Sequence, residues 1–97
     1  MRMPDRGETL LDIGWRIRML REALGYQNAA QFAAYVGWTS QQLNNYETGR
    51  KRPEITMATK LCHRTGVTLD WIYRGERSGL PLQLASIIQD YLRSQAA

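Results

Sequence analysis

The chain has 97 residues, which is enough for one compact domain with a modest hydrophobic core. Its composition is that of an ordinary globular protein, and no apolar run approaches the roughly 20 residues that a membrane span needs. A single cysteine excludes an internal disulfide framework, and the first residues lack an apolar signal core, so we expect a cytoplasmic protein. An excess of 13 Lys and Arg over 9 Asp and Glu gives a net charge of +4, which favours a polyanionic partner.

Residues 1–8 are predicted to form a flexible arm, because a proline and a glycine there oppose regular structure. Thr9 and Asp12 resemble a capping box that begins a helix running to about Leu24. Four apolar residues recur at i, i+4, i+7 and i+11 and predict a face that packs on a core: Ile13, Ile17, Leu20 and Leu24.

Two short helices separated by a tight turn follow. Asn28 is predicted to cap the first of them, and Gln31 would complete its capping box. Gly37 permits the positive φ angle of a tight turn. Thr39 is then predicted to cap the second helix, with Gln42 at the box position.

The rest of the chain predicts three more helices. Pro53 suits the first turn of a helix that ends near Thr65, and a short helix with Leu69 and Ile72 facing inward follows over 69–74. A sixth helix over 82–93 carries the clearest amphipathic stripe, formed by Leu84, Ile87, Ile88, Tyr91 and Leu92. No segment alternates with period two for long enough to predict a strand. We therefore expect an all-α domain.

The candidate functional residues lie on the predicted helix after Gly37. One side of it carries uncharged hydrogen-bonding groups: Ser40, Gln41, Gln42, Asn44 and Asn45. On a plain solvated surface Glu and Lys would be the better helix formers. An amide can donate to and accept from adenine at once, so this face predicts readout of bases in the major groove, with Gln41 as the best candidate. The alternative is a solvated face without a partner.

A basic loop follows this helix directly, at Arg50, Lys51 and Arg52. Three cations beside a base-reading helix would contact phosphates and add attraction that does not depend on sequence. In isolation such a triplet is usually a solvated charge run.

Several features recur at fixed offsets over some sixty residues. They are Arg21 and Gly25, Ala33 and Gly37, Leu43, Tyr46-Glu47, Gly49, Arg52-Pro53, and the stretch Gly66-Val67-Thr68-Leu69-Asp70-Trp71-Ile72. On these residues the chain, from about Ile13 to Gly75, resembles the Cro/C1-type (XRE-like) helix-turn-helix family of phage and bacterial repressors. The resemblance implies a five-helix, lambda-repressor-like bundle over 9–75 that binds double-stranded DNA, usually as a homodimer on a palindromic operator.

The resemblance also implies roles for individual residues. Arg21 and Glu47 match positions that form an internal ion pair in the family. At Ala29 the family commonly has a glutamine that binds phosphate, so Gln27 or Asn28 is expected to replace it. Thr39 is expected to contact phosphate as well. The N-terminus of the helix after Asn28 would itself attract a phosphate through its free N–H groups.

The C-terminal segment 80–97 lies beyond the resemblance. Its stripe would either close the core or form a dimer interface through Leu84, Ile87, Ile88 and Tyr91. The leading hypothesis is a transcriptional repressor that is not an enzyme. The alternative is an antitoxin-like or adaptor module that binds a protein partner through this helix. No spacing suggests a catalytic set, a metal site or a cofactor loop, since Cys62 and His63 are adjacent and point apart on a helix.

Overall fold

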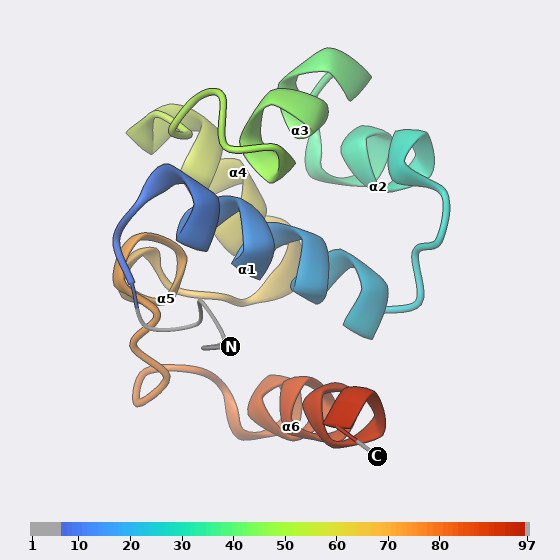
Figure 1. The fold of residues 1–97 in the computed structure, drawn as a ribbon, viewed down its shortest axis with the longest axis vertical. Helices are drawn as coiled ribbons and strands as arrows, with labels where there is room; N and C mark the ends of the chain where they lie inside the picture. Colours follow the sequence, from blue (N-terminus) through green and yellow to red (C-terminus); the bar gives the residue numbers. More distant parts are fainter. Residues whose placement is uncertain (1–6, 97) are drawn as a thin grey trace.

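A computed structural model describes residues 7–96, so the predicted arm lies mostly outside the described residues. The described part is all-helical, as predicted, and contains no strand (Figure 1). Its helices are α1 (Leu10–Ala23), α2 (Ala29–Val36), α3 (Ser40–Glu47), α4 (Ile55–Thr65), α5 (Leu69–Arg74) and α6 (Leu82–Ala96).

The helix caps follow the sequence closely. Thr9 with Asp12 and Thr39 with Gln42 both form reciprocal capping boxes, which set the first residues of α1 and α3. Asn28 caps α2 through its side-chain oxygen, which accepts from the N–H of Gln31, but the predicted capping box is wrong because the Gln31 side chain does not return the bond. Between α2 and α3 the chain turns at Gly37, whose φ of +93° is a conformation that a residue with a Cβ rarely adopts. The predicted helix-turn-helix unit is therefore present in the fold.

Two predicted details of the fourth and fifth helices are wrong. Pro53 does not begin α4, which starts two residues later at Ile55. The proline is buried, and its carbonyl oxygen accepts a hydrogen bond of 2.6 Å from the hydroxyl of Tyr73, which holds it in the preceding loop. Leu69 is not inward-facing either, because it is the first residue of α5 and is 37% exposed, whereas Trp71 is fully buried.

The core is built around α1. Apolar side chains of every helix meet there, and α3 lies on one side of α1 while α6 lies on the other (Figure 1). Arg16 is also buried, and its guanidinium donates two hydrogen bonds, of 3.1 and 2.9 Å, to the carbonyl oxygen of Ile72. This contact joins α1 to α5 and satisfies a carbonyl at the helix end.

Gly14 lies where α1 crosses the last turn of α3. A Cβ atom at this position would be 2.4 Å from the carbonyl oxygen of Tyr46 and 2.7 Å from that of Glu47. Real Cβ atoms do not approach backbone so closely, so the absence of a side chain is what lets the two helices touch.

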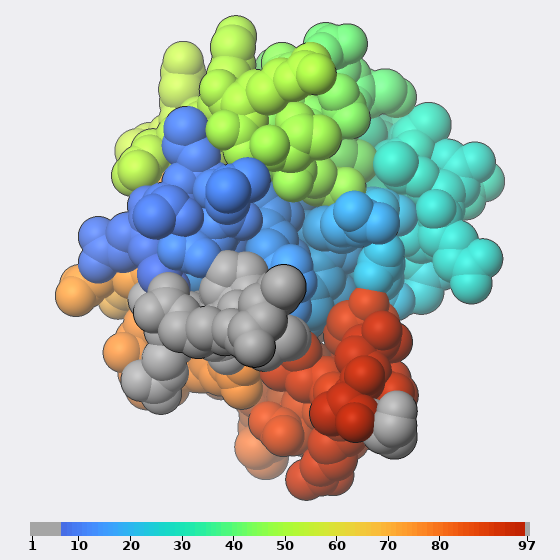
Figure 2. Space-filling view, viewed as in Figure 1, coloured from blue at the N-terminus to red at the C-terminus, as the bar shows by residue number. Residues whose placement is uncertain are grey.

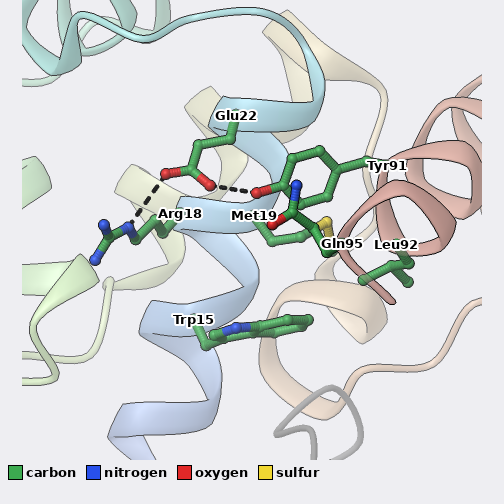
Figure 3. Close-up of a pocket in the computed structure, with 7 residues that line it drawn as sticks. All are labelled: Trp15, Arg18, Met19, Glu22, Tyr91, Leu92 and Gln95. Carbon is green, nitrogen blue, oxygen red and sulfur yellow. Dashed lines mark hydrogen bonds and ion pairs between the residues drawn. The ribbon is translucent and has the colours of Figure 1, made fainter. Parts of the chain in front are cut away.

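The apolar stripe of α6 packs against the domain itself. Leu84 and Ile88 are only 6% and 1% exposed and belong to the core, while Tyr91 and Leu92 pack against it. Of the two alternatives for this stripe, Leu84 and Ile88 therefore follow the one in which it closes the core, since both are buried within the domain where α6 packs on α1. At the edge of this contact the Tyr91 hydroxyl donates a hydrogen bond to Glu22, which is paired with Arg18 (Figure 3).

The hydrogen bond between Tyr91 and Glu22 predicts a stability that depends on pH. It lowers the pKa of Glu22 below its ordinary 4.5 and raises the pKa of Tyr91 above its ordinary 10.0. The lowered pKa gives stability that is present above pH 4.5 and is lost as the pH falls through the folded-state value. The raised pKa gives stability that is present below pH 10 and is lost as the pH rises through the folded-state value.

We therefore expect Tyr91→Phe to destabilise the domain most between about pH 5 and pH 9, with the difference from wild type shrinking on either side. Urea unfolding of both proteins across this range measures it. A difference that stayed constant with pH would show that the hydroxyl makes no such contact.

Candidate nucleic-acid interface

Polar and apolar residues occupy opposite faces of α3. At about 100° per residue, Ser40, Gln41, Asn44 and Asn45 share an arc of roughly 140°, while the buried Leu43 and Tyr46 lie on the other side. Ser40, Gln41 and Asn44 are exposed and Asn45 is half-buried, so the arc faces outward. A helix of this diameter fits the major groove, which is about 12 Å wide.

Gln42 is bound elsewhere and does not belong to this face. Its side-chain oxygen accepts a 2.8 Å hydrogen bond from the backbone N–H of Thr39, and its amide nitrogen lies 3.7 Å from the sulfur of Met57. The sequence predicted both a capping and a base-reading role for Gln42. The structure shows the capping role, so we leave it out of the base-reading set.

Trp38 and Tyr46 fix the inner side of α3. The Trp38 indole N–H donates to the carbonyl oxygen of Met57 at 3.1 Å, and its ring meets the Tyr46 ring edge-on at 5.0 Å between centroids. Both residues are buried, and burial raises the pKa of the Tyr46 phenol. This packing holds the outer face at a fixed angle, which a reader of base edges requires.

The one acidic residue of α3 is turned inward. Glu47 receives two hydrogen bonds from Arg21, of 2.8 and 3.3 Å, and the two side chains are only 12% and 8% exposed. These contacts raise the pKa of Arg21. Arg21 also donates to the carbonyl oxygens of Tyr26 and Gln27, so it joins α1, the loop before α2 and the end of α3. The outer face of α3 consequently carries no negative charge.

The basic loop extends from the end of α3. Arg50, Lys51 and Arg52 are all exposed, and Arg52 donates a 3.2 Å hydrogen bond to the carbonyl oxygen of Glu8. The backbone N–H groups of Arg50 and Lys51 both bond the carbonyl oxygen of Asn45, which ties the loop to the helix. Residues of α3 and this loop together form one end of the molecule (Figure 2).

The start of α2 is exposed, as a phosphate site would require. The side chains of Gln27 and Asn28 are exposed, and so is Ala29. The Asn28 oxygen is occupied by its capping bond to the N–H of Gln31, which leaves its amide NH₂ to donate a hydrogen bond elsewhere. Thr39 is likewise exposed, with its hydroxyl accepting from the N–H of Gln42.

Sequence reasoning missed two features of this interface. One is the close approach that Gly14 permits between α1 and α3. The other is a hydrogen bond of 3.1 Å between the side chains of Gln41 and Asn45, which the i, i+4 spacing of two amides could have indicated.

Within residues 7–96, no helix is long and apolar enough to cross a membrane, and no acidic, His or Cys cluster could hold a metal ion.

Two short helices joined by a glycine turn, with the second presenting its polar face, define a helix-turn-helix domain. The family model described as helix-turn-helix (HTH_3) matches residues 17–72, which is more than half of the chain. The chain therefore belongs to this family, of the Cro/C1 type. This membership supports DNA binding in transcription regulation as the class of function.

A relative in Bacillus subtilis (strain 168) is similar to the chain. It is the SPbeta prophage-derived uncharacterized HTH-type transcriptional regulator YonR, 30% identical over 69 residues. The match covers 71% of this chain but only 63% of the relative, so the chain spans less than two thirds of that protein's length. No solved structure matches the chain.

Proposed function

We propose that this domain regulates transcription by binding duplex DNA at specific sequences, with α3 inserted into the major groove. The observation that carries the proposal is the outward face of Ser40, Gln41, Asn44 and Asn45. The cationic side chains of the basic loop lie next to this face. Glu47, the one acidic residue of α3, is turned inward and paired with Arg21. Amides on such a face match adenine, and the absence of arginine from α3 disfavours guanine readout.

Phosphate contacts would position this helix. Arg50, Lys51 and Arg52 would contact the backbone on one side of the groove, and the start of α2 on the other. To contact a phosphate oxygen, the Arg52 guanidinium would give up its hydrogen bond to the carbonyl oxygen of Glu8. At the start of α2, Gln27 and the amide NH₂ of Asn28 would replace the glutamine that the family has at Ala29, and Thr39 would add a contact before α3.

The proposed regulator acts as a repressor on a two-fold site. Eight residues of α3 reach only a few base pairs, so two copies one helical turn apart would give the affinity that an operator needs. Occlusion of a promoter then represses it. The similarity to a Bacillus subtilis protein named as an HTH-type transcriptional regulator supports the regulatory role.

The outer face of α6 does not suit the dimer contact. Because α6 lies across α1 from α3, a two-fold contact there would point the two α3 helices away from each other (Figure 1). A protein partner that bound the apolar stripe of α6 would first have to separate α6 from α1.

Selection of bound duplexes from a random DNA pool, at about 0.15 M salt, tests the function. We expect an inverted repeat whose half-sites lie about 10 base pairs apart, bound roughly a thousandfold or more tighter than random DNA. Equal binding of selected and random duplexes would refute the proposal.

The salt dependence of binding tests the basic loop. Replacing Arg50 or Lys51 by alanine is expected to weaken binding to all duplexes alike and to reduce the slope of log K against log salt by about 0.9 per lost contact. Arg93→Ala on α6 removes the same charge far from the interface and should leave the slope unchanged. A parental slope in the loop variants would show that these cations do not touch phosphate.

A further inference from the structure

We propose that Asn45 is a positioning residue for Gln41, so that the two amides act as one unit in reading a base pair. The inference rests on the proposed function and specifies which side chains set its sequence preference. Its basis is the hydrogen bond of 3.1 Å that the amide nitrogen of Gln41 donates to the side-chain oxygen of Asn45. The two residues lie one turn apart on the outward arc of α3.

The bond fixes the orientation of an otherwise mobile side chain. Gln41 is exposed, and a free glutamine loses rotamer freedom when it binds a base. Its amide has two N–H donors and one oxygen. When the N–H anti to the oxygen is given to Asn45, the other N–H and the oxygen remain side by side to meet a base. A donor beside an acceptor is the pattern that pairs with N7 and the N6 amino group of adenine.

Asn45 is itself well anchored. It is half-buried beside a hollow of about 190 Å³ that Lys51 and Arg52 also line. Its backbone carbonyl accepts hydrogen bonds from the N–H groups of Arg50, at 2.9 Å, and Lys51, at 3.2 Å. The residue that orients the base reader is thus joined to the loop proposed to contact phosphate. The side chain that would contact a base and the loop that would contact the DNA phosphates are therefore held at a fixed distance from each other.

A double-mutant cycle tests the proposal on the full chain. Wild type, Gln41→Ala, Asn45→Ala and the double variant are titrated against the selected operator and against duplexes with each base pair changed in turn. We expect Gln41→Ala to abolish discrimination at one base pair, and Asn45→Ala to reduce it about fivefold or more at the same pair. In the Gln41→Ala background, Asn45→Ala should add nothing at that pair.

Two further variants separate positioning from other effects. Asn44→Ala removes another amide of the proposed reading face, so it should weaken binding through its own contact but leave discrimination at the Gln41 base pair unchanged. Asn45→Asp keeps the acceptor for the Gln41 N–H, so discrimination at that pair should persist although the added charge weakens binding to every duplex.

Unchanged discrimination in Asn45→Ala, or equal effects of Asn45→Ala with and without Gln41, would overturn the inference while leaving the proposed function intact. A wild-type protein that binds every duplex equally would instead refute the proposed function.

Discussion

Replacing Glu47 by alanine is expected to lower the free energy of unfolding by about 3–5 kcal/mol, which is a large part of the stability of a domain this size. The reason is the charge left behind. Arg21 is 8% exposed and would lose both of its carboxylate hydrogen bonds, keeping only the carbonyl oxygens of Tyr26 and Gln27. Urea unfolding at neutral pH measures the loss.

An exposed ion pair provides the matched control. Asp90 and Arg93 on α6 are 75% and 73% exposed and 3.7 Å apart, so Asp90→Ala should cost no more than about 1 kcal/mol. Glu47→Gln keeps one acceptor oxygen for Arg21 but replaces the other oxygen by an NH₂ donor and removes the charge, so its cost should fall between the two. If Glu47→Ala unfolds at the wild-type urea concentration, the pair does not stabilise the fold.

The sequence was sufficient to predict features that depend on neighbouring residues. Capping boxes at Thr9 and Thr39 and the turn at Gly37 follow from local hydrogen bonding and φ preference, and the structure has all three. The polar arc of α3 was also visible, because the helical period alone separates it from Leu43 and Tyr46.

Features that depend on which elements meet could not be predicted in the same way. The stripe of α6 indicated a buried face but not what covers it, so closing the core and forming a dimer interface both remained open until the structure placed Leu84 and Ile88 in the core. Gln42 had two local roles open to it. Only the structure shows that the Gln42 side chain takes the capping role, because it lies at the inner edge of α3, bonded to the N–H of Thr39 and next to Met57.

Gly14 is the clearest example, since nothing in its local sequence marks it. A glycine inside a helix usually costs stability, and Gly→Ala there should stabilise the protein by up to about 1 kcal/mol. At Gly14 we expect the opposite sign. A Cβ would lie 2.4 and 2.7 Å from two carbonyl oxygens of α3, and backbone atoms cannot rotate away as a side chain would. Gly14→Ala should therefore cost about 3 kcal/mol and lower Tm by more than about 10 °C.

A second glycine separates this steric effect from the change of residue type. Gly79 lies in the loop before α6, and a Cβ there would meet only the methyl group of Thr68, at an ordinary 3.4 Å. Gly79→Ala should change stability by less than about 1 kcal/mol. If Gly14→Ala proved as stable as wild type, α1 and α3 would not be in backbone contact. If it is destabilised as expected, the close contact of α1 with the carbonyl oxygens of Tyr46 and Glu47 contributes, together with the packing of Trp38 and Tyr46, to holding α3 in place.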